Sequence, residues 1–175
     1  NKYRIIGIGI DYGQQNATTY QAGGLNMDKG RLDGLAEYYH SGRDTGRQKS
    51  PSIYAKDFAD FTDMLHMRYQ CSIFYAYIDP SASYQVIIKP AENDVALGIS
   101  RVQKCLAFNI LRVDPSQENL DREFGTYEYD KKALENGKEV PVKMDDHCMD
   151  AERYLVMGLW NRLKQFLPKA ERGED

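Results

Sequence analysis

Residues 3–13 read Tyr-Arg-Ile-Ile-Gly-Ile-Gly-Ile-Asp-Tyr-Gly, and this stretch indicates how the chain folds. Its first eight residues are mostly apolar and rich in isoleucine, which is typical of a short strand buried on both faces of a sheet. Asp11-Tyr12-Gly13 then ends the run with a turn signal. We therefore expect a buried strand over 3–10, with Asp11 at its carboxyl end.

Two more strands follow it, over 17–26 and 31–40, and Lys29-Gly30 forms the tight turn between them. The first third of the chain is thus expected to be an antiparallel meander, followed by a polar loop over 41–50. Helices and strands then alternate: a helix over 51–69, a strand over 72–78, a helix from residue 93 or 94, a strand over 108–113, a short helix over 116–123, a strand or edge over 124–129 and a helix from residue 145 or 146 to about residue 167. This order predicts an α/β fold with a mixed central sheet, the meander joined by parallel strands, and helices on both faces.

Length and composition restrict the class of protein. The 175 residues suit one domain, which we place over 1–168, followed by a polar tail over 169–175. A net charge of −3 argues against a surface that binds nucleic acid or anionic membrane by charge alone. No apolar run approaches the roughly 18 residues needed to cross a bilayer. Cys71, Cys105 and Cys148 are far apart and odd in number, as expected of reduced core thiols in a cytosolic protein.

Two acids occupy equivalent positions, because Asp11 and Asp79 each follow an apolar strand. The carboxyl ends of neighbouring strands line the crevice where open sheets bind ligands. Two carboxylates held there repel each other unless a cation lies between them, and oxygen ligands select hard ions such as Mg²⁺ or Mn²⁺. Asp150, three residues after His147 in the first turn of the last helix, supplies a third carboxylate. Three such acids can hold two ions about 3.5–4 Å apart, an arrangement that cleaves phosphodiesters.

Each of these residues also has a structural explanation. Asp before Gly or Pro is a common turn residue, and acids at a helix start cap it and complement its dipole. By that explanation Asp145 or Asp146 caps the last helix, and His147 is a surface or hydrogen-bonded residue. His40 and His66 have no partners in the sequence pattern and are expected to be structural.

Several motifs, in the right order and over nearly the whole chain, resemble the nuclease domain of the large terminase subunit of tailed bacteriophages. In chain order they are Ile8-Gly9-Ile10-Asp11-Tyr12-Gly13, Tyr77-Ile78-Asp79-Pro80-Ser81-Ala82, Asn93-Asp94-Val95-Ala96-Leu97-Gly98-Ile99, Glu123-Phe124-Gly125-Thr126-Tyr127 and, most specifically, Asp146-His147-Cys148-Met149-Asp150-Ala151-Glu152-Arg153-Tyr154. The resemblance implies an RNase H-like fold and an endonuclease that cuts double-stranded viral DNA with two divalent cations, Mg²⁺ or Mn²⁺, during headful genome packaging. It implies that Asp11, Asp79 and Asp150 are metal ligands and that His147 is an auxiliary catalytic group.

The resemblance also implies partners and a location. These are double-stranded DNA, the small terminase subunit and the portal, in the host cytoplasm and without a membrane, with the isolated domain a monomer. The family's packaging ATPase is expected on the N-terminal side, outside this chain, because no Gly-x-x-x-x-Gly-Lys-Ser/Thr loop occurs here.

Two groups of basic residues are candidates for phosphate contacts. In the family, the segment corresponding to 130–143 forms a hairpin beside the active site, and Asn136-Gly137 is a hairpin turn signal. Its lysines, like a second strip of basic residues, could contact phosphate, although a solvated hairpin explains them equally well. The candidates are Lys131, Lys132, Lys138 and Lys143 in the hairpin and Arg43, Arg47, Lys49 and Lys56 in the strip.

Three alternatives stay open. The acids alone do not separate a terminase nuclease from a ribonuclease H or a junction resolvase. Gly9-Ile10-Asp11-Tyr12-Gly13 also looks like the first phosphate loop of actin-like ATPases and sugar kinases, but the chain has length for only one of their two lobes. The last alternative is a non-catalytic module that only docks a partner.

Overall fold

The computed structural model describes residues 2–13, 16–71, 74–78, 88–90 and 92–172, so Asp79 and the predicted turn after it lie outside the described residues. A six-stranded sheet of order β5-β4-β1-β2-β3-β6 forms its centre. The strands are β1 (Ile6–Asp11), β2 (Ala17–Asn26), β3 (Arg31–Ser41), β4 (Phe74–Ile78), β5 (Ile88–Pro90) and β6 (Leu111–Arg112). β1, β2 and β3 form the antiparallel meander, whereas β4, β5 and β6 pair in parallel, which confirms the predicted mixed sheet.

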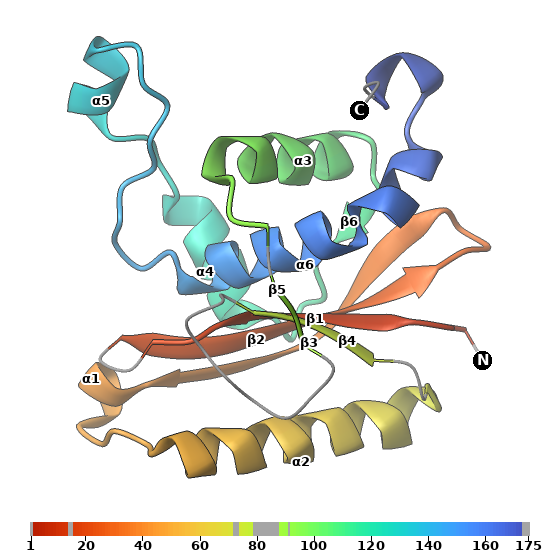
Figure 1. Cartoon of the computed structure of the whole chain (residues 1–175), viewed down its shortest axis with the longest axis vertical. Coiled ribbons are helices and arrows are strands. Elements are labelled where there is room, and N and C mark those ends of the chain that lie inside the picture. Colours follow the sequence, from red (N-terminus) through yellow and green to blue (C-terminus); the bar gives the residue numbers. More distant parts are fainter. Residues whose placement is uncertain (1, 14–15, 72–73, 79–87, 91, 173–175) are drawn as a thin grey trace.

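Helices cover both faces of this sheet (Figure 1). One face carries α2 (Pro51–Tyr69), and the other carries α6 (His147–Leu163) with α3 (Val95–Ala107) outside it. α4 (Glu118–Thr126) lies beside the start of α6, and α5 (Lys131–Glu135) projects away from the body (Figure 1). A short helix, α1 (Gly42–Thr45), follows β3, and Lys164–Phe166 and Lys169–Glu171 form 3₁₀ turns after α6. No helix within the described residues is long and apolar enough to cross a membrane.

The alternation of isoleucine and glycine in β1 decides how the two layers meet. Ile6, Ile8 and Ile10 are buried in the core cluster that includes Phe61 and Leu65 of α2. The glycines between them face α6, because successive residues of a strand point to opposite faces. A Cβ on Gly9 would lie 1.8 Å from the carbonyl oxygen of Ala151, and one on Gly7 would lie 2.5 Å from a methyl group of Leu155. The backbone of α6 therefore rests directly on β1.

Local signals place several boundaries correctly. β2 and α2 have the bounds that the sequence predicts, and Ser50 caps α2 before Pro51. The three cysteines are buried and form no disulfide among the described residues, which confirms them as core thiols.

Other predictions are wrong. The predicted strand over 108–113 pairs only at Leu111–Arg112, because Asn109 adopts a left-handed conformation (φ 54°) that ends α3. The prediction of a strand or edge over 124–129 is wrong for residues 124–126, because α4 continues to Thr126. Leu120 and Glu123 are buried at helical spacing in that helix. β5 was not expected.

The two ends of the segment 130–143 run antiparallel to each other, and an isolated β-bridge joins Tyr129 to Pro141 at its base. Asp130 N–H donates to the Val140 carbonyl, and Asp130 also caps α5 through the Ala133 N–H at 2.8 Å. The tip is thus the helix α5 instead of a two-residue hairpin turn, and Asn136-Gly137 ends that helix.

The contact between β1 and α6 predicts the effect of adding one methyl group. Gly9→Ala places a carbon on the Ala151 backbone, which cannot move aside as a flexible side chain would. We expect a loss of roughly 3 kcal/mol or more in the free energy of unfolding, measured by urea denaturation. Gly125→Ala is the matched control: a Cβ at this position of α4 has no neighbour within 4 Å, so we expect a gain of about 0.5–1 kcal/mol. Equal stabilities of the two variants would contradict this packing.

Glu152 of α6 predicts a pH dependence of stability. Its side chain is fully buried, and burial raises its pKa from 4.5 to about 7. The folded chain therefore binds this proton more tightly than the unfolded chain does, and the stability gained below pH 4.5 is lost as pH rises through about 7. Glu152→Gln stays neutral, so we expect it to exceed the unmodified protein by on the order of 1–3 kcal/mol at pH 8 and to approach it at about pH 4.

Urea denaturation across this pH range measures the difference. Glu135→Gln, at an exposed position of α5, serves as the control and should follow the unmodified profile. Parallel profiles for Glu152→Gln and the unmodified protein would show that the buried carboxyl does not carry this titration.

Candidate active site

Asp11 and His147, which are 136 positions apart, meet where β1 ends beside the start of α6. The two atoms Asp11 Oδ2 and His147 Nδ1 are 2.8 Å apart. Asp11 reaches this position because it directly follows Ile10 in β1, and His147 because it is the first residue of α6. The close approach of α6 to Gly9 brings the two ends together.

Asp150, one turn into α6, lies between two cationic side chains. Its Oδ1 accepts hydrogen bonds from the Arg153 guanidinium at 2.9 and 3.3 Å, and its Oδ2 accepts one from the Lys143 ammonium at 3.0 Å. The same ammonium is 2.9 Å from Asp146 Oδ2. Charge-assisted hydrogen bonds of this kind are shorter and stronger than those between neutral groups.

These side chains line a single open cavity of about 310 Å³. Its lining consists of Asp11, Asn16, Arg43, Lys143, Met144, Asp145, Asp146, His147 and Asp150. Arg43, from α1, reaches across the rim to Asp145 Oδ1 at 3.5 Å. Four acids and three basic side chains thus surround a space open to solvent.

The cavity perturbs the titration of Asp11 and His147. Burial raises the pKa of Asp11, the hydrogen bond from His147 opposes this shift, and the charges of Asp150 and Asp146 add to it. The hydrogen bond to Asp11 raises the pKa of His147, although burial works against it. Asp11 therefore lies close enough to the other acids to feel their repulsion, and a positive charge beside it is favoured.

The side chain that caps α6 lies in another helix and is not predicted from the sequence. Asp146 holds the N-cap position but makes no side-chain capping hydrogen bond, and Asp145 lies outside the helix in a left-handed conformation (φ 49°). Instead, Glu123 Oε2 of α4 accepts the N–H groups of Cys148 and Met149 at 2.7 and 3.0 Å. The prediction is therefore correct for the N-cap position, which Asp146 occupies, and wrong for the capping hydrogen bond, which neither Asp145 nor Asp146 makes. In the sequence, Glu123 stands out only as the first residue of the motif Glu123-Phe124-Gly125-Thr126-Tyr127.

The predicted phosphate-contact residues are placed differently from one another. Lys49 is held by Asp57 at 2.6 Å and by the Tyr38 hydroxyl at 3.0 Å, and Lys143 pairs with two acids of the cavity. Arg43 lines the cavity, and Arg47 is exposed nearby in sequence. The remaining hairpin lysines are exposed on or beside α5: Lys131, Lys132 and Lys138. Lys56 pairs with Asp60 on the surface of α2.

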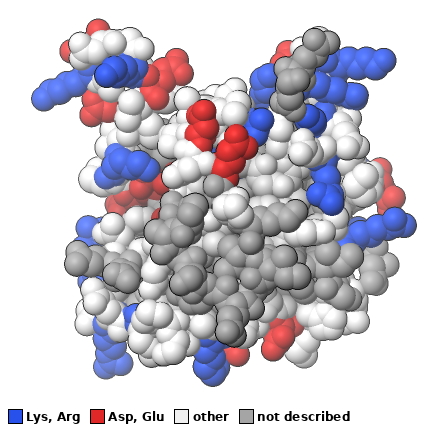
Figure 2. Space-filling view, viewed as in Figure 1, with Lys and Arg blue, Asp and Glu red and all other residues white. Residues whose placement is uncertain are grey.

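Figure 2 shows basic and acidic side chains interspersed on one face of the molecule, and the described residues of that face form no continuous basic surface. On that face only local basic groups are available to nucleic acid, in agreement with the net charge of −3.

The cavity offers carboxylate oxygens to divalent cations. Within the described residues, no three His, Cys, Asp or Glu side chains cluster closely enough to hold a metal ion. The third predicted ligand, Asp79, lies outside those residues, although Ile78, which precedes it in the chain, pairs with Ile10 just before Asp11. The donors that are described fit a hard cation, because they are carboxylate oxygens and already attract the Lys143 ammonium.

Comparison with known proteins is informative only at the level of structure. No family model matches the chain, and no curated protein is significantly similar to it. The large terminase of a thermophilic bacteriophage is similar in structure, with a TM-score of 0.82 and 30% sequence identity over 91% of this chain. The chain spans 40% of the length of that protein.

Two isolated nuclease domains are similar over most of their own length. The nuclease domain of the P22 large terminase has a TM-score of 0.64 at 15% identity, covering 95% of this chain and 87% of that domain. The nuclease domain of the SPP1 large terminase, solved with bound Mn, has a TM-score of 0.58 at 19% identity, covering 89% and 86%. The RNase H-like fold class expected from the sequence is thereby confirmed. The chain has the fold of the bacteriophage large-terminase nuclease domains, and its resemblance to this family is confirmed.

Proposed function

We propose that this chain is a divalent-metal-dependent endonuclease that cleaves double-stranded DNA during headful packaging of a viral genome. One observation carries the proposal: Asp11 and Asp150, from the end of a strand and the first turn of a helix, line a single cavity together with His147. The structural likeness to large-terminase nuclease domains supports the same reaction.

Asp11, Asp79 and Asp150 are the proposed ligands of two Mg²⁺ or Mn²⁺ ions. The SPP1 nuclease domain, which has a similar fold, was solved with bound Mn, and this supports the use of a divalent cation. When bound, such ions activate water and stabilise charge on the leaving oxygen of a phosphodiester. Asp79 is assigned from the sequence, because it follows Ile78 at the edge of the sheet where Asp11 follows Ile10.

The chain's own residues then hold charges and protons in place. Asp11 and Asp150 act as carboxylates that fix the cations, so no side-chain nucleophile is needed. His147 Nδ1 bonds to Asp11, which leaves Nε2 to exchange a proton with solvent or substrate. Burial and the neighbouring acids make Asp11 harder to ionise, so cation binding is expected to weaken on acidification.

The biological setting extends the proposal. The reaction would take place in the host cytoplasm, with double-stranded DNA as substrate and the small terminase subunit and portal as partners. Arg43 at the cavity, Arg47 on the exposed loop after it, and Lys131, Lys132 and Lys138 around α5 are proposed to contact the phosphate backbone without reading sequence.

Substitution of the three aspartates tests the mechanism. Asp11→Asn, Asp79→Asn and Asp150→Asn should each reduce Mn²⁺-dependent nicking of plasmid DNA by at least about 100-fold, because each replaces a charged ligand with a neutral amide. Gel assays measure the nicking, and circular dichroism checks that each variant is folded. Asp63→Asn, at an exposed position of α2, is the control and should cut like the unmodified protein.

The same assay separates the alternatives. RNA–DNA hybrids and four-way junctions are supplied beside plasmid DNA. Cleavage of the hybrid alone would indicate a ribonuclease H, and cleavage of junctions alone would indicate a resolvase. Undiminished nicking by all three aspartate variants would refute the proposed mechanism.

Lys143 provides an independent test of where the cations bind. Its ammonium lies 2.9 Å from Asp146 Oδ2 and 3.0 Å from Asp150 Oδ2. It would therefore compete with a divalent cation for these carboxylates. We expect Lys143→Met to bind Mn²⁺ about tenfold more tightly, a gain of roughly 1.4 kcal/mol, and to be less stable without metal. Isothermal titration calorimetry measures the affinity, with Lys131→Met on α5 as the exposed control. Equal affinities would indicate that the cations do not bind next to Asp150.

A further inference from the structure

Glu123 makes the hydrogen bonds that a local N-cap residue would normally make for α6. Its Oε2 accepts the N–H groups of Cys148 and Met149, the second and third residues of the helix, at 2.7 and 3.0 Å. Free N–H groups in the first turn need such an acceptor, which is usually the side chain of the residue that precedes the helix. Here the acceptor comes from another helix, 25 residues earlier in the chain.

No described residue at the start of α6 takes this role. The Asp146 side chain makes no capping bond, and its carboxylate pairs with Lys143. The free N–H groups in the first turn of α6 are therefore bonded to α4, whereas the preceding loop contacts that turn through the side chain of Lys143. His147 and Asp150 flank the two capped residues in the sequence. The cap therefore fixes the backbone from which both side chains extend.

α4 is in turn fixed to the sheet by a second carboxylate. Glu37 of β3 accepts the N–H groups of Asn119 and Leu120 at 2.8 and 3.1 Å, and these are again the second and third residues of their helix. Glu37 also accepts a hydrogen bond from Gln21 of β2 at 3.2 Å. Two carboxylates in series thus connect the sheet to α4 and α4 to α6.

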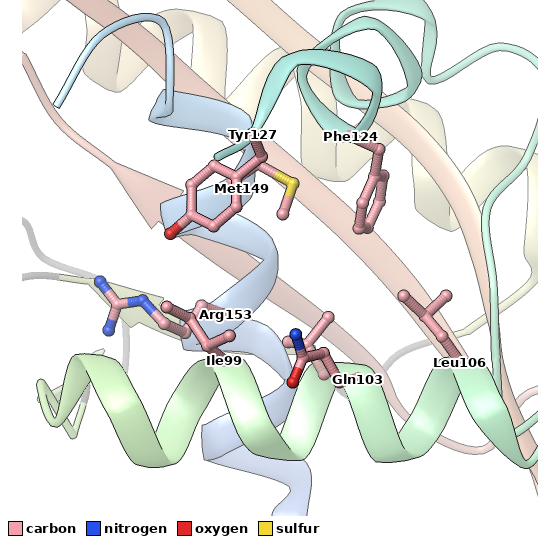
Figure 3. Close-up of a pocket in the computed structure, with 8 residues that line it drawn as sticks. Ile99, Gln103, Leu106, Phe124, Tyr127, Met149 and Arg153 are labelled. Carbon is pink, nitrogen blue, oxygen red and sulfur yellow. The ribbon is translucent and has the colours of Figure 1, made fainter. Parts of the chain in front are cut away.

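The same two segments line one groove. Phe124, at the end of α4, and Tyr127, just after it, line this groove together with Met149 and Arg153 of α6, and α3 forms its other side (Figure 3). Arg153 is the residue that pairs with Asp150 Oδ1. Glu123 itself is 1% exposed, so the cap is shielded from water.

We infer that Glu123 is a positioning residue that holds the first turn of α6 so that His147 and Asp150 face Asp11. This inference rests on the proposed function, because it concerns the geometry of the proposed metal ligands. Glu123 touches neither substrate nor cation, and it acts through the backbone of Cys148 and Met149.

The test compares two substitutions of Glu123 with one matched cap variant. Glu123→Ala removes the acceptor, whereas Glu123→Gln keeps an oxygen in the same place. Asp94→Ala removes another carboxylate cap, the one that accepts the Leu97 N–H at 2.9 Å at the start of α3. Mn²⁺ affinity is measured by calorimetry, amide hydrogen exchange of Cys148 and Met149 by NMR, and thermal stability by circular dichroism.

We expect Glu123→Ala to speed exchange of the two amides and to weaken Mn²⁺ binding about tenfold. Glu123→Gln should restore slow exchange and bring the Mn²⁺ affinity within about threefold of the unmodified protein. Asp94→Ala should lower the melting temperature without changing the affinity. An effect on affinity that merely follows the loss of stability in both alanine variants would overturn the inference. So would a Glu123→Gln variant with protected amides but the weak affinity of Glu123→Ala, since charge and not position would then matter.

Failure of the proposed function gives a different result. If the unmodified protein binds no Mn²⁺ and cuts no DNA, the proposed function is wrong. The role of Glu123 in positioning α6 can still be tested by structure. In that case a crystal structure of Glu123→Ala measures the distance between His147 Nδ1 and Asp11 Oδ2. A distance that stays at 2.8 Å would refute the role of Glu123, and a longer one would support it.

Discussion

The contact between β1 and α6 is the constraint on which the rest of the structure depends. A helix normally stands away from a sheet by the length of the side chains between them, but Gly7 and Gly9 offer none on the face that α6 covers. The carbonyl of Ala151 can therefore approach the strand closely. β1 ends one residue beyond Ile10, and α6 begins at His147. The same contact therefore brings Asp11 Oδ2 to 2.8 Å from His147 Nδ1.

The charges around this contact explain how the fold tolerates several acids in one cavity. Asp150 has Arg153 and Lys143 as partners, and Asp11 has His147. Burying a carboxylate costs free energy unless it is paired or hydrogen-bonded, and each of these acids meets that condition. The compensation is least complete at Asp11, where burial and the other acids together outweigh the hydrogen bond and raise the pKa. A further positive charge would therefore be most favourable next to Asp11.

The sequence predicts those features that depend on near neighbours in the chain, such as the start of α2 at Pro51 and the turns of the meander. The ends of the two elements that carry Asp11 and His147 could be identified in the same way, but their distance apart could not. What sequence reasoning misses is long-range and polar. The cap of α6 comes from Glu123 in another helix, and a search for capping residues beside α6 does not find it. For the same reason Lys143 is predicted as a phosphate contact, since nothing in its sequence position shows that it pairs with acids of the cavity.

The pairing of Lys143 changes how cation binding at this cavity should be understood. A cluster of acids alone would be held apart by repulsion, and metal would have to assemble it. Here an ammonium and an imidazole already hold the carboxylates together, at 2.9 to 3.0 Å and at 2.8 Å. The proposed metal binding at Asp11 and Asp150 would then exchange one positive charge for another. Its free energy would be the difference between two attractions, because the Lys143 ammonium would have to give up its contacts with Asp146 and Asp150. Lys143 belongs to the projecting segment 130–143, so the proposed exchange would remove a contact between that segment and the start of α6.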